Sequence, residues 1–120
     1  MRVCFRSAVD PRHLSAYREA HASVWPEMLR ELKAAGWNDY TLHLGDDGLL
    51  IGILECDDLD AARARMALTE VNGRWQAEMA SLFPPSEGNP DEGFIVLDEV
   101  FNLEEQLAAA SKETKDAHNE

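Results

Sequence analysis

The centre of the chain reads WNDYTLHLGDDGLLIGILEC over residues 37–56, and this stretch decides the fold. Apolar and polar side chains alternate over residues 37–44, which is the period of a half-buried strand. Residues 49–56 are nearly all apolar, which predicts a strand in the middle of a sheet. Between them, residues 45–48 are typical of a hairpin turn because a glycine stands at each end. The stretch therefore predicts a central antiparallel hairpin.

The segments before the hairpin predict a strand and a helix. Side chains alternate over residues 2–9, as in a strand with one buried face. Over residues 13–35, apolar or aromatic side chains recur every three or four positions, which places them on one helix face, and Gly36 follows as a C-terminal cap. Pro26 lies inside this segment. The sequence allows either one helix that is kinked at Pro26 or a second short helix that begins there after a turn at Trp25.

The segments after the hairpin repeat this order. Residues 57–83 predict a helical region that is interrupted at Asn72-Gly73, because asparagine and glycine favour turns. A loop of prolines, glycines and acids follows over residues 84–93, and residues 94–103 predict a last strand. The order strand, helix, strand, strand, helix, strand predicts an α+β fold. This fold is a ferredoxin-like βαββαβ sandwich with both helices on one face of an antiparallel sheet.

The pattern divides the chain into one domain and a tail. Residues 1–103 form the predicted ferredoxin-like domain. Residues 104–120 have no apolar period beyond Leu107, so we expect an acidic C-terminal tail that is a frayed helix or disordered. The second face of the predicted sheet is apolar and has no covering helix. We therefore expect a homodimer that covers this face.

Composition limits the classes of function. The 120 residues include 23 acidic and 11 basic side chains, a net charge of −12. Such a chain repels nucleic acids and anionic membrane surfaces, so neither is an expected partner. The N-terminal residues lack the long apolar stretch of a secretion signal, and the longest apolar run, residues 49–54, is far below the roughly 20 residues that span a bilayer. Cys4 and Cys56 fit neither a disulfide framework nor a zinc motif. We expect a cytoplasmic protein with reduced thiols and no metal.

The charge distribution also limits the class of ligand that the domain is expected to bind. Residues 104–120 hold five acids and two lysines, so three of the twelve net negative charges belong to the tail and nine to the domain. This charge on the domain favours a neutral sugar over a sugar phosphate.

The segment 13–35 carries the most informative cluster of side chains. Tyr17, His21 and Trp25 step by four, so they stack along one helix face, which is the apolar one. Polar groups on a buried face need partners or a pocket. An imidazole beside aromatic rings would suit a sugar, whose C–H face stacks while its hydroxyls hydrogen-bond. A satisfied core histidine among packing aromatics is the simpler alternative. Tyr40, on the inward face of its strand, is placed to meet the cluster.

In these residues the sequence resembles the L-rhamnose mutarotase family. The resemblance covers residues 1–103. Its motifs are Tyr17-x-x-x-His21-x-x-Val24-Trp25-Pro26-Glu27, Gly36 with Asp39-Tyr40, the strand over residues 50–55, Arg74-Trp75 with Met79, and Leu97-x-Glu99-Val100-Phe101-x-Leu103. The first motif is the most specific, because tryptophan-proline-glutamate four residues after a histidine is uncommon within a helix.

The resemblance implies a dimer of ferredoxin-like units, a dimeric α/β barrel. It implies an isomerase, an aldose 1-epimerase that interconverts the α and β anomers of L-rhamnose or a similar 6-deoxysugar without a cofactor. His21 would be the proton donor, and Tyr17 and Tyr40 would bind the neutral sugar. Imidazole suits this reaction because its pKa near 7 lets it both give and take a proton.

The second half of the chain completes the predicted substrate-binding set. By resemblance, Trp75 binds the sugar, although the residues alone also allow a core tryptophan. The family often has a second tryptophan where this chain has Gln76, and an amide cannot stack as an indole does. Trp25, next to Pro26, is the last predicted substrate-binding residue.

Two alternatives stand beside the mutarotase. A cofactor-free monooxygenase-like enzyme on the same dimeric scaffold would need a wide apolar pocket. A non-catalytic sugar-binding or assembly protein would bind a ligand without changing the rate of anomer exchange.

Overall fold

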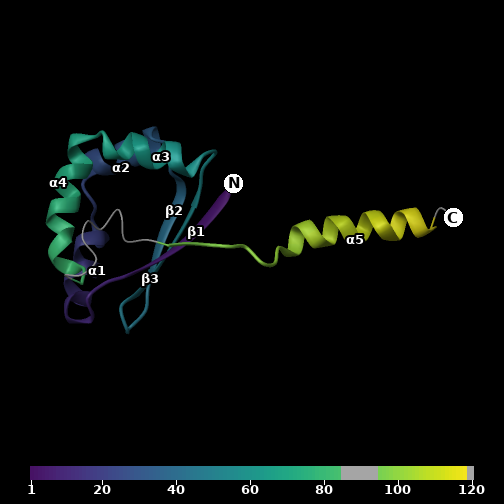
Figure 1. Ribbon diagram of the computed structural model, residues 1–120, viewed down its shortest axis with the longest axis horizontal. Coiled ribbons are helices and arrows are strands. Elements are labelled where there is room, and N and C mark those ends of the chain that lie inside the picture. Colours follow the sequence, from purple (N-terminus) through teal and green to yellow (C-terminus); the bar gives the residue numbers. More distant parts are fainter. Residues whose placement is uncertain (85–94, 119–120) are drawn as a thin grey trace.

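The computed structural model describes residues 1–84 and 95–118, whose course is drawn in Figure 1. In chain order the elements are β1 (Arg2–Ala8), η1 (Pro11–His13), α1 (Leu14–Ala22), α2 (Pro26–Ala34), β2 (Asn38–Leu44), β3 (Leu49–Glu55), α3 (Leu59–Ala67), α4 (Glu70–Met79), η2 (Ala80–Leu82), β4 (Ile95–Leu97) and α5 (Leu103–His118).

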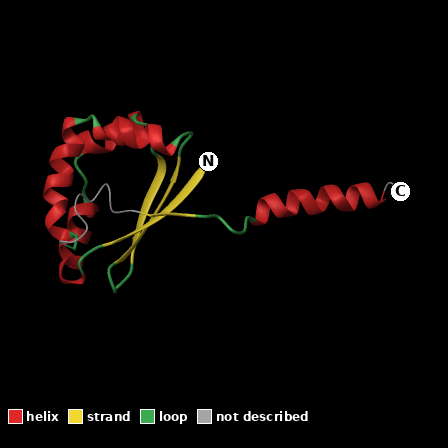
Figure 2. Cartoon of the chain, in the orientation of Figure 1, coloured by secondary structure: helices red, strands yellow, loops and turns green. Residues whose placement is uncertain are grey.

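The sheet has the predicted topology. Its four strands are antiparallel in the order β2-β3-β1-β4. Helices α1 to α4 lie on one side of this sheet (Figures 1 and 2). The ferredoxin-like α+β fold is therefore confirmed. Within the described residues, the last strand is shorter than predicted, because β4 pairs only along Cys4–Arg6 of β1. The predicted loop over residues 84–93 lies, apart from Pro84, outside the described residues.

The first helical segment consists of two helices. Helix α1 ends at Ala22, and α2 begins at Pro26 with Trp25 as its N-cap. Proline suits the first turn of a helix, where its missing N–H needs no partner and its fixed φ already fits. The interpretation of Pro26 as the start of a second helix is therefore right, and that of a single kinked helix is wrong. Gly36, at φ 101°, follows the C-cap of α2 as predicted.

The second helical region breaks at a different place from the one predicted. Helix α3 ends at Ala67 and α4 begins at Glu70, so Asn72 and Gly73 lie inside α4 and the predicted break there is wrong. The cause is Thr69, whose hydroxyl oxygen accepts a hydrogen bond from the backbone N–H of Asn72 at 3.3 Å and so caps the helix. A glycine inside a helix costs only about 1 kcal/mol, which tertiary packing overrides.

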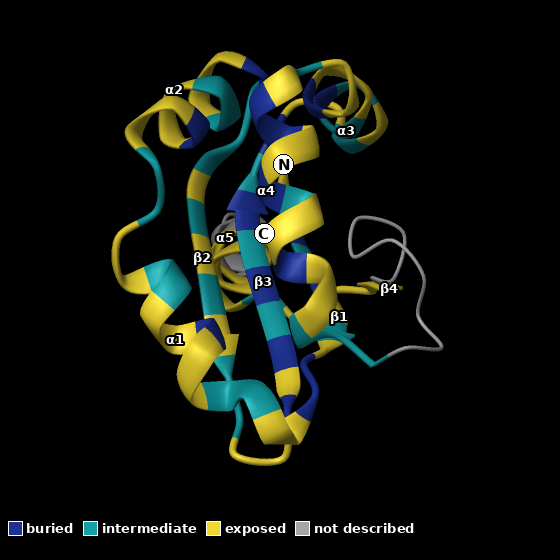
Figure 3. Cartoon of the chain, turned by 90° about the vertical axis from the view of Figure 1, so that its left-hand side faces the viewer, coloured by how far each residue is buried: buried dark blue, intermediate teal, exposed yellow. Residues whose placement is uncertain are grey.

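Alternation along the strands gives the sheet a covered face and an open face. The buried side chains of Val3, Phe5, Leu50 and Leu54 lie on the covered face. Phe5 pairs with Gly52 across β1 and β3, and a Cβ atom at Gly52 would overlap the Phe5 ring. Glycine is therefore the residue that lets this ring lie across the central strand. Figure 3 shows the alternation of buried and less buried residues along β3.

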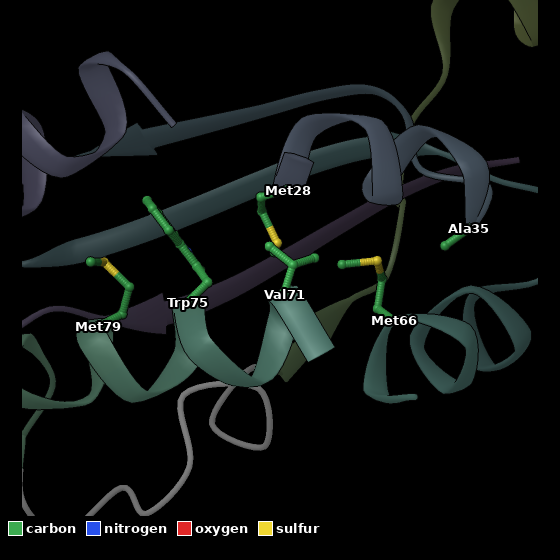
Figure 4. Packing of buried hydrophobic residues seen from close by; sticks show 6 residues of the cluster. All are labelled: Met28, Ala35, Met66, Val71, Trp75 and Met79. Carbon is green, nitrogen blue, oxygen red and sulfur yellow. The ribbon is translucent and has the colours of Figure 1, made fainter. Parts of the chain in front are cut away.

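The helices hold a further part of the core among themselves. Six side chains that are at most 6% exposed meet between α2, α3 and α4, as Figure 4 shows: Met28, Ala35, Met66, Val71, Trp75 and Met79. Full burial of a large apolar side chain contributes about 1.5–3 kcal/mol, so this cluster fixes α4 against α2. It also fixes the place of Trp75 beside the cavity described below.

The open face carries two rows in which apolar and polar side chains are mixed. The strand register sets these rows across β2, β3, β1 and β4, with Thr41, Ile53, Cys4 and Leu97 in one and His43, Ile51, Arg6 and Ile95 in the other. The two β4 side chains, Ile95 and Leu97, are 54% and 38% exposed. In Figure 1 the helices α1 to α4 lie on the other side of the sheet from this face.

Helix α5 extends away from the sheet and the other helices (Figure 1). The segment predicted as a tail is thus helical from Leu103 to His118, and the division of the chain at residue 103 stays a prediction. In the part of the chain that the structure describes, no helix has the length and apolar character needed to cross a membrane.

Candidate functional site

A cavity with two lobes lies between the covered face of the sheet and helices α1, α2 and α4. The smaller one, which we call the aromatic lobe, has a volume of about 90 Å³, and the larger, aliphatic lobe has about 310 Å³. Six residues line both lobes: His21, Trp37, Tyr40, Leu42, Trp75 and Gln76. The aromatic lobe adds Phe5, Ser7, Tyr17, Leu50, Met79 and Phe83. The aliphatic lobe adds Val24, Met28, Leu29, Leu32, Met66 and Asn72.

His21 stands in the last turn of α1, where the two lobes meet. Its ring stacks on Tyr17, with centroids 4.1 Å apart, and meets the edge of Trp75 at 5.4 Å. Its Nδ1 lies 2.9 Å from the backbone carbonyl oxygen of Tyr17. A carbonyl oxygen only accepts, so Nδ1 carries the proton and donates it, and Nε2 of the neutral ring is left as the acceptor.

The surroundings of His21 favour the neutral imidazole. Burial lowers the pKa of His21 from its ordinary 6.5, and the hydrogen bond to the Tyr17 carbonyl offsets part of that shift. The ring is therefore a base near neutral pH. This base is poised to take a proton from a group bound beside it.

Tyr17 is one turn earlier on the same helix and only 5% exposed. Its ring lies between His21 and the edge of Phe83, whose centroid is 6.0 Å away. Burial raises the pKa of the Tyr17 phenol above its ordinary value, so the hydroxyl keeps its proton. Tyr17 thus places a proton donor at the wall of the aromatic lobe, next to the basic His21.

Strand β2 has an irregularity beside Tyr40. Asn38 pairs with Glu55 and Thr41 with Ile53, so two residues of β2 stand opposite one residue of β3. The extra residue is a β-bulge, with Asp39 at φ 47°. Tyr40 is in phase with Leu42 and Leu44 on the covered face, and without the bulge Trp37, on the other side of it, would turn to the open face. The bulge therefore brings Trp37 to the covered face as well, where the ring of Tyr40 lies near Trp37 and Phe5, at centroid distances of 4.9 and 6.3 Å.

Trp75 forms the wall of the cavity on α4, and Trp25 stands behind it. The two indoles meet edge-on with centroids 5.0 Å apart. The Arg74 guanidinium lies 5.7 Å from the centre of the Trp25 ring and bonds Glu27 at 3.0 Å. Trp25 is not among the described residues that line either lobe. It contacts Trp75, and its predicted contact with substrate stays a prediction.

The lining of the cavity is electrically neutral. Among the described residues that line the two lobes there is no aspartate, glutamate, lysine or arginine, and His21 is the single histidine. Such a lining fits an uncharged ligand that stacks on aromatic rings and hydrogen-bonds to a few polar groups. Within the described ranges, no three His, Cys, Asp or Glu side chains group as metal ligands do.

The structure brings together most of the predicted site residues and adds others. His21, Tyr17, Tyr40, Trp75 and Gln76 all line the cavity, from α1, β2 and α4. Sequence reasoning missed further lining residues: Trp37, Phe83 and Asn72. A signal existed only for Asn72. Had Thr69 been read as an N-cap, Asn72 and Gln76 would have fallen four residues apart on one helix face.

Comparison with known proteins agrees with this geometry. The family model for L-rhamnose mutarotase matches residues 2–103. An L-rhamnose mutarotase from Burkholderia orbicola (strain MC0-3) is 35% identical over 103 residues, which cover 85% of this chain and 97% of that protein. The crystal structure of an L-rhamnose mutarotase from Formosa agariphila has a TM-score of 0.69 at 24% identity, covering 86% of this chain and 98% of that one. An antibiotic biosynthesis monooxygenase has a TM-score of 0.52 at 16% identity, covering 83% and 98%, which is a likeness of fold alone. The match of model and sequence over nearly the whole sheet-and-helix unit shows that this chain belongs to the L-rhamnose mutarotase family.

Proposed function

We propose that the protein interconverts the α and β anomers of L-rhamnose or a similar 6-deoxysugar, with His21 as the acid–base group. Membership of the family supports a sugar mutarotase, which is an isomerase. The observation that carries the proposal is the neutral aromatic cavity with one basic imidazole, whose Nδ1 is engaged by the Tyr17 carbonyl and whose Nε2 is the acceptor.

The chemistry of mutarotation needs one base and one acid. His21 Nε2 takes the proton of the anomeric hydroxyl, the bond between the anomeric carbon and the ring oxygen breaks, and a carbonyl forms. The ring oxygen receives a proton in the same step. After rotation about the bond to the next carbon, the ring closes on the other face, the ring hydroxyl gives up its proton and the imidazolium returns one to the new anomeric oxygen. No electron leaves the sugar, so this scheme requires only proton carriers.

We assign the second proton carrier to Tyr17. Its phenol is protonated because it is buried, and it lies beside the imidazole. Acid–base catalysis of this kind contributes about 10²–10⁴-fold, or about 3–5 kcal/mol. Tyr17→Phe keeps the backbone carbonyl that orients His21 and removes the phenol, so we expect a lower kcat with a small change in KM.

The remaining residues of the site bind and orient the sugar in this proposal. Tyr40 and Trp75 both line the two lobes, and their rings supply aromatic surfaces for the C–H face of the sugar ring. Gln76 adds an amide to the same wall. A monooxygenase-like reaction needs a wide apolar pocket, and the polar groups of His21, Gln76 and Asn72 in the lining count against it.

The test is the rate of anomer exchange of the wild-type protein. Saturation-transfer NMR on L-rhamnose, L-fucose and L-mannose measures exchange between the α and β signals in the presence and absence of protein. We expect exchange of at least one 6-deoxysugar to rise well above the buffer rate. If the protein binds one of the three sugars but the exchange rate of all three stays at the buffer rate, the protein is a sugar-binding protein and the proposed mutarotase activity is overturned.

We also propose a homodimer formed through the open face of the sheet, in the manner of a dimeric α/β barrel. The support is the apolar run of Ile53, Cys4 and Leu97 across that face, with Leu97 38% exposed at its edge, and the aliphatic side chains of Ile51 and Ile95 on either side of Arg6. Contiguous apolar surface of this kind marks an interaction site. The proposed cytoplasmic location rests on the sequence alone.

Sedimentation of one open-face variant tests the dimer. Ile53→Lys places a charge at the centre of the face and should convert a dimer into a monomer. Leu68→Lys is the matched control, because Leu68 is 88% exposed at the end of α3, away from that face. Wild-type protein that sediments as a monomer at micromolar concentration contradicts the proposal.

A further inference from the structure

Helix α4 presents two amide side chains to the cavity, one helical turn apart. Asn72 is 5% exposed and lines the aliphatic lobe, and Gln76 lines both lobes. The Nε2 of Gln76 donates a hydrogen bond to Oδ1 of Asn72 over 3.2 Å. Positions four apart lie on the same helix face. The two side chains therefore form a short polar strip on the cavity wall.

The surroundings of this strip are apolar. The other residues that the aliphatic lobe adds are Val24, Met28, Leu29, Leu32 and Met66. A buried amide in such surroundings is costly unless it is hydrogen-bonded. Asn72 makes a further interaction besides the bond from Gln76. Its carbonyl in turn sets the direction in which the Gln76 amide points.

The hydrogen-bond capacity of Gln76 defines what it can recognise. A primary amide has two N–H donors and one carbonyl acceptor, and Asn72 takes one of the donors. Because Gln76 lines both lobes, its carbonyl oxygen and second N–H are the groups with which it can bind a ligand in the cavity. A sugar hydroxyl matches both because it donates and accepts. A C–H group at the same place leaves the amide without a partner inside an apolar lobe, which is unfavourable.

We propose that the Asn72–Gln76 pair selects neutral monosaccharides by one hydroxyl group, at a ring position away from the anomeric carbon. Gln76 contacts this hydroxyl, and Asn72 is a positioning residue that orients the Gln76 amide. The inference rests on the proposed function, because it takes the anomeric carbon to lie at His21, on the facing helix α1. Its consequence is that the site discriminates against the sugar that lacks this one hydroxyl.

The test removes the Gln76 amide from the protein and single hydroxyl groups from the sugar, separately and together, as in a double-mutant cycle. The probes are L-rhamnose and its 2-deoxy, 3-deoxy and 4-deoxy derivatives, and the proteins are the wild type and Gln76→Leu, which is similar in size and lacks the amide. Binding is measured by calorimetry and exchange by saturation-transfer NMR. For one of the three deoxy sugars, we expect wild-type affinity to be about five- to tenfold below that for L-rhamnose, the size of one neutral hydrogen bond. Gln76→Leu should bind that deoxy sugar and L-rhamnose equally.

The role of Asn72 is tested through non-additivity. Asn72→Ala should raise KM for L-rhamnose severalfold with kcat retained, and the double variant with Gln76→Leu should be no weaker in binding than Gln76→Leu alone. A residue that only supports the fold lowers the melting temperature of the protein but leaves the preference among the four sugars unchanged. Gly73→Ala, on the same helix with nothing within 4 Å of its added Cβ, is the matched control and should leave the preference unchanged.

The outcomes separate this proposal from the mutarotase itself. If the loss from each missing hydroxyl is the same in Gln76→Leu as in the wild type, the pair recognises none of them and the proposal is overturned. If the wild type binds these sugars without accelerating exchange, the mutarotase proposal is overturned, and the binding cycle still decides the role of the pair. If none of the four sugars binds, the proposal for the pair is overturned, and the exchange rates of L-rhamnose, L-fucose and L-mannose decide the mutarotase.

Discussion

The two faces of the sheet are made by the same strands but differ in the burial of their side chains and in what covers them. On β1, Phe5 points to the covered face and is 4% exposed, whereas its neighbours Cys4 and Arg6 point to the open face and are less buried. On β3, Gly52 makes room for the Phe5 ring, and Ile51 and Ile53 beside it carry apolar side chains to the other side.

This difference indicates which face of the sheet can hold an active site. Helices α1, α2 and α4 close the covered face into a cavity, so His21 is shielded from water and its pKa is lowered. The open face has no such cover in the described chain and carries the aliphatic side chains of Ile51 and Ile53, on which the proposed association with a second copy rests. In the two proposals, a strand with period two thus serves catalysis with one set of side chains and assembly with the other.

The largest expected effect comes from comparing a truncation on each face. Phe5→Ala removes a buried aromatic ring and should lower the free energy of unfolding by about 3–5 kcal/mol. Ile53→Ala, on the open face, should cost less than half as much when the protein is dilute and more when it is concentrated, because it weakens the proposed dimer. Urea unfolding at several protein concentrations measures both. If both variants lose the same free energy of unfolding at every protein concentration, the two faces do not differ in burial and assembly as described.

The bulge that brings Trp37 to the covered face beside Tyr40 gives the next effect. Asp39 has φ 47°, which a β-branched residue adopts only with strain. Asp39→Val should cost about 1–2 kcal/mol of stability and raise KM, because the strain is relieved by loss of the bulge, which turns Trp37 out of the cavity. Asp39→Asn is the control and should behave like the wild type. Chemical denaturation and exchange kinetics report the two effects, and an unchanged KM in the valine variant would contradict this role of the bulge.

The covered face also predicts a pH dependence. The pKa of His21 is below 6.5 in the folded protein, so between that value and 6.5 the unfolded chain binds the extra proton and the folded chain does not. Stability from the neutral ring is complete above pH 6.5 and is lost as the pH falls toward the folded pKa. Exchange above the buffer rate should decline over an acid limb centred below pH 6.5. The stability loss should vanish in His21→Phe, and an acid limb centred above pH 6.5 would contradict the neutral base.

The smallest effect is expected away from both faces. Gly73 lies in an exposed part of α4 and nothing is within 4 Å of an added Cβ. Gly73→Ala should raise the free energy of unfolding by about 0.5–1 kcal/mol, since alanine favours the helix. Thermal unfolding measures this gain. A loss of stability would mean that α4 tolerates no side chain at this position.

The sequence predicts the fold better than it predicts the site. Alternation in the strands and the Gly-Asp-Asp-Gly turn are local signals, so the sheet and the inward face of Tyr40 follow from them. The helix break at Asn72-Gly73 was wrongly predicted because turn propensity is a weaker signal than the Thr69 cap. Local sequence signals do not determine which aromatic rings come into contact, because these contacts depend on tertiary packing. Trp25 and Trp75 touch only because α2 packs on α4, and the bulge at Asp39 leaves no mark in the period of the strand.

The central claim is that the imidazole on the covered face moves the proton. The most direct test is saturation-transfer exchange of L-rhamnose by His21→Ala, with circular dichroism and thermal unfolding as the measure of its fold. The account predicts a folded variant whose exchange falls to within a few per cent of the buffer rate, a loss of about 10²–10⁴-fold. A folded variant that exchanges the anomers as fast as the wild type contradicts it.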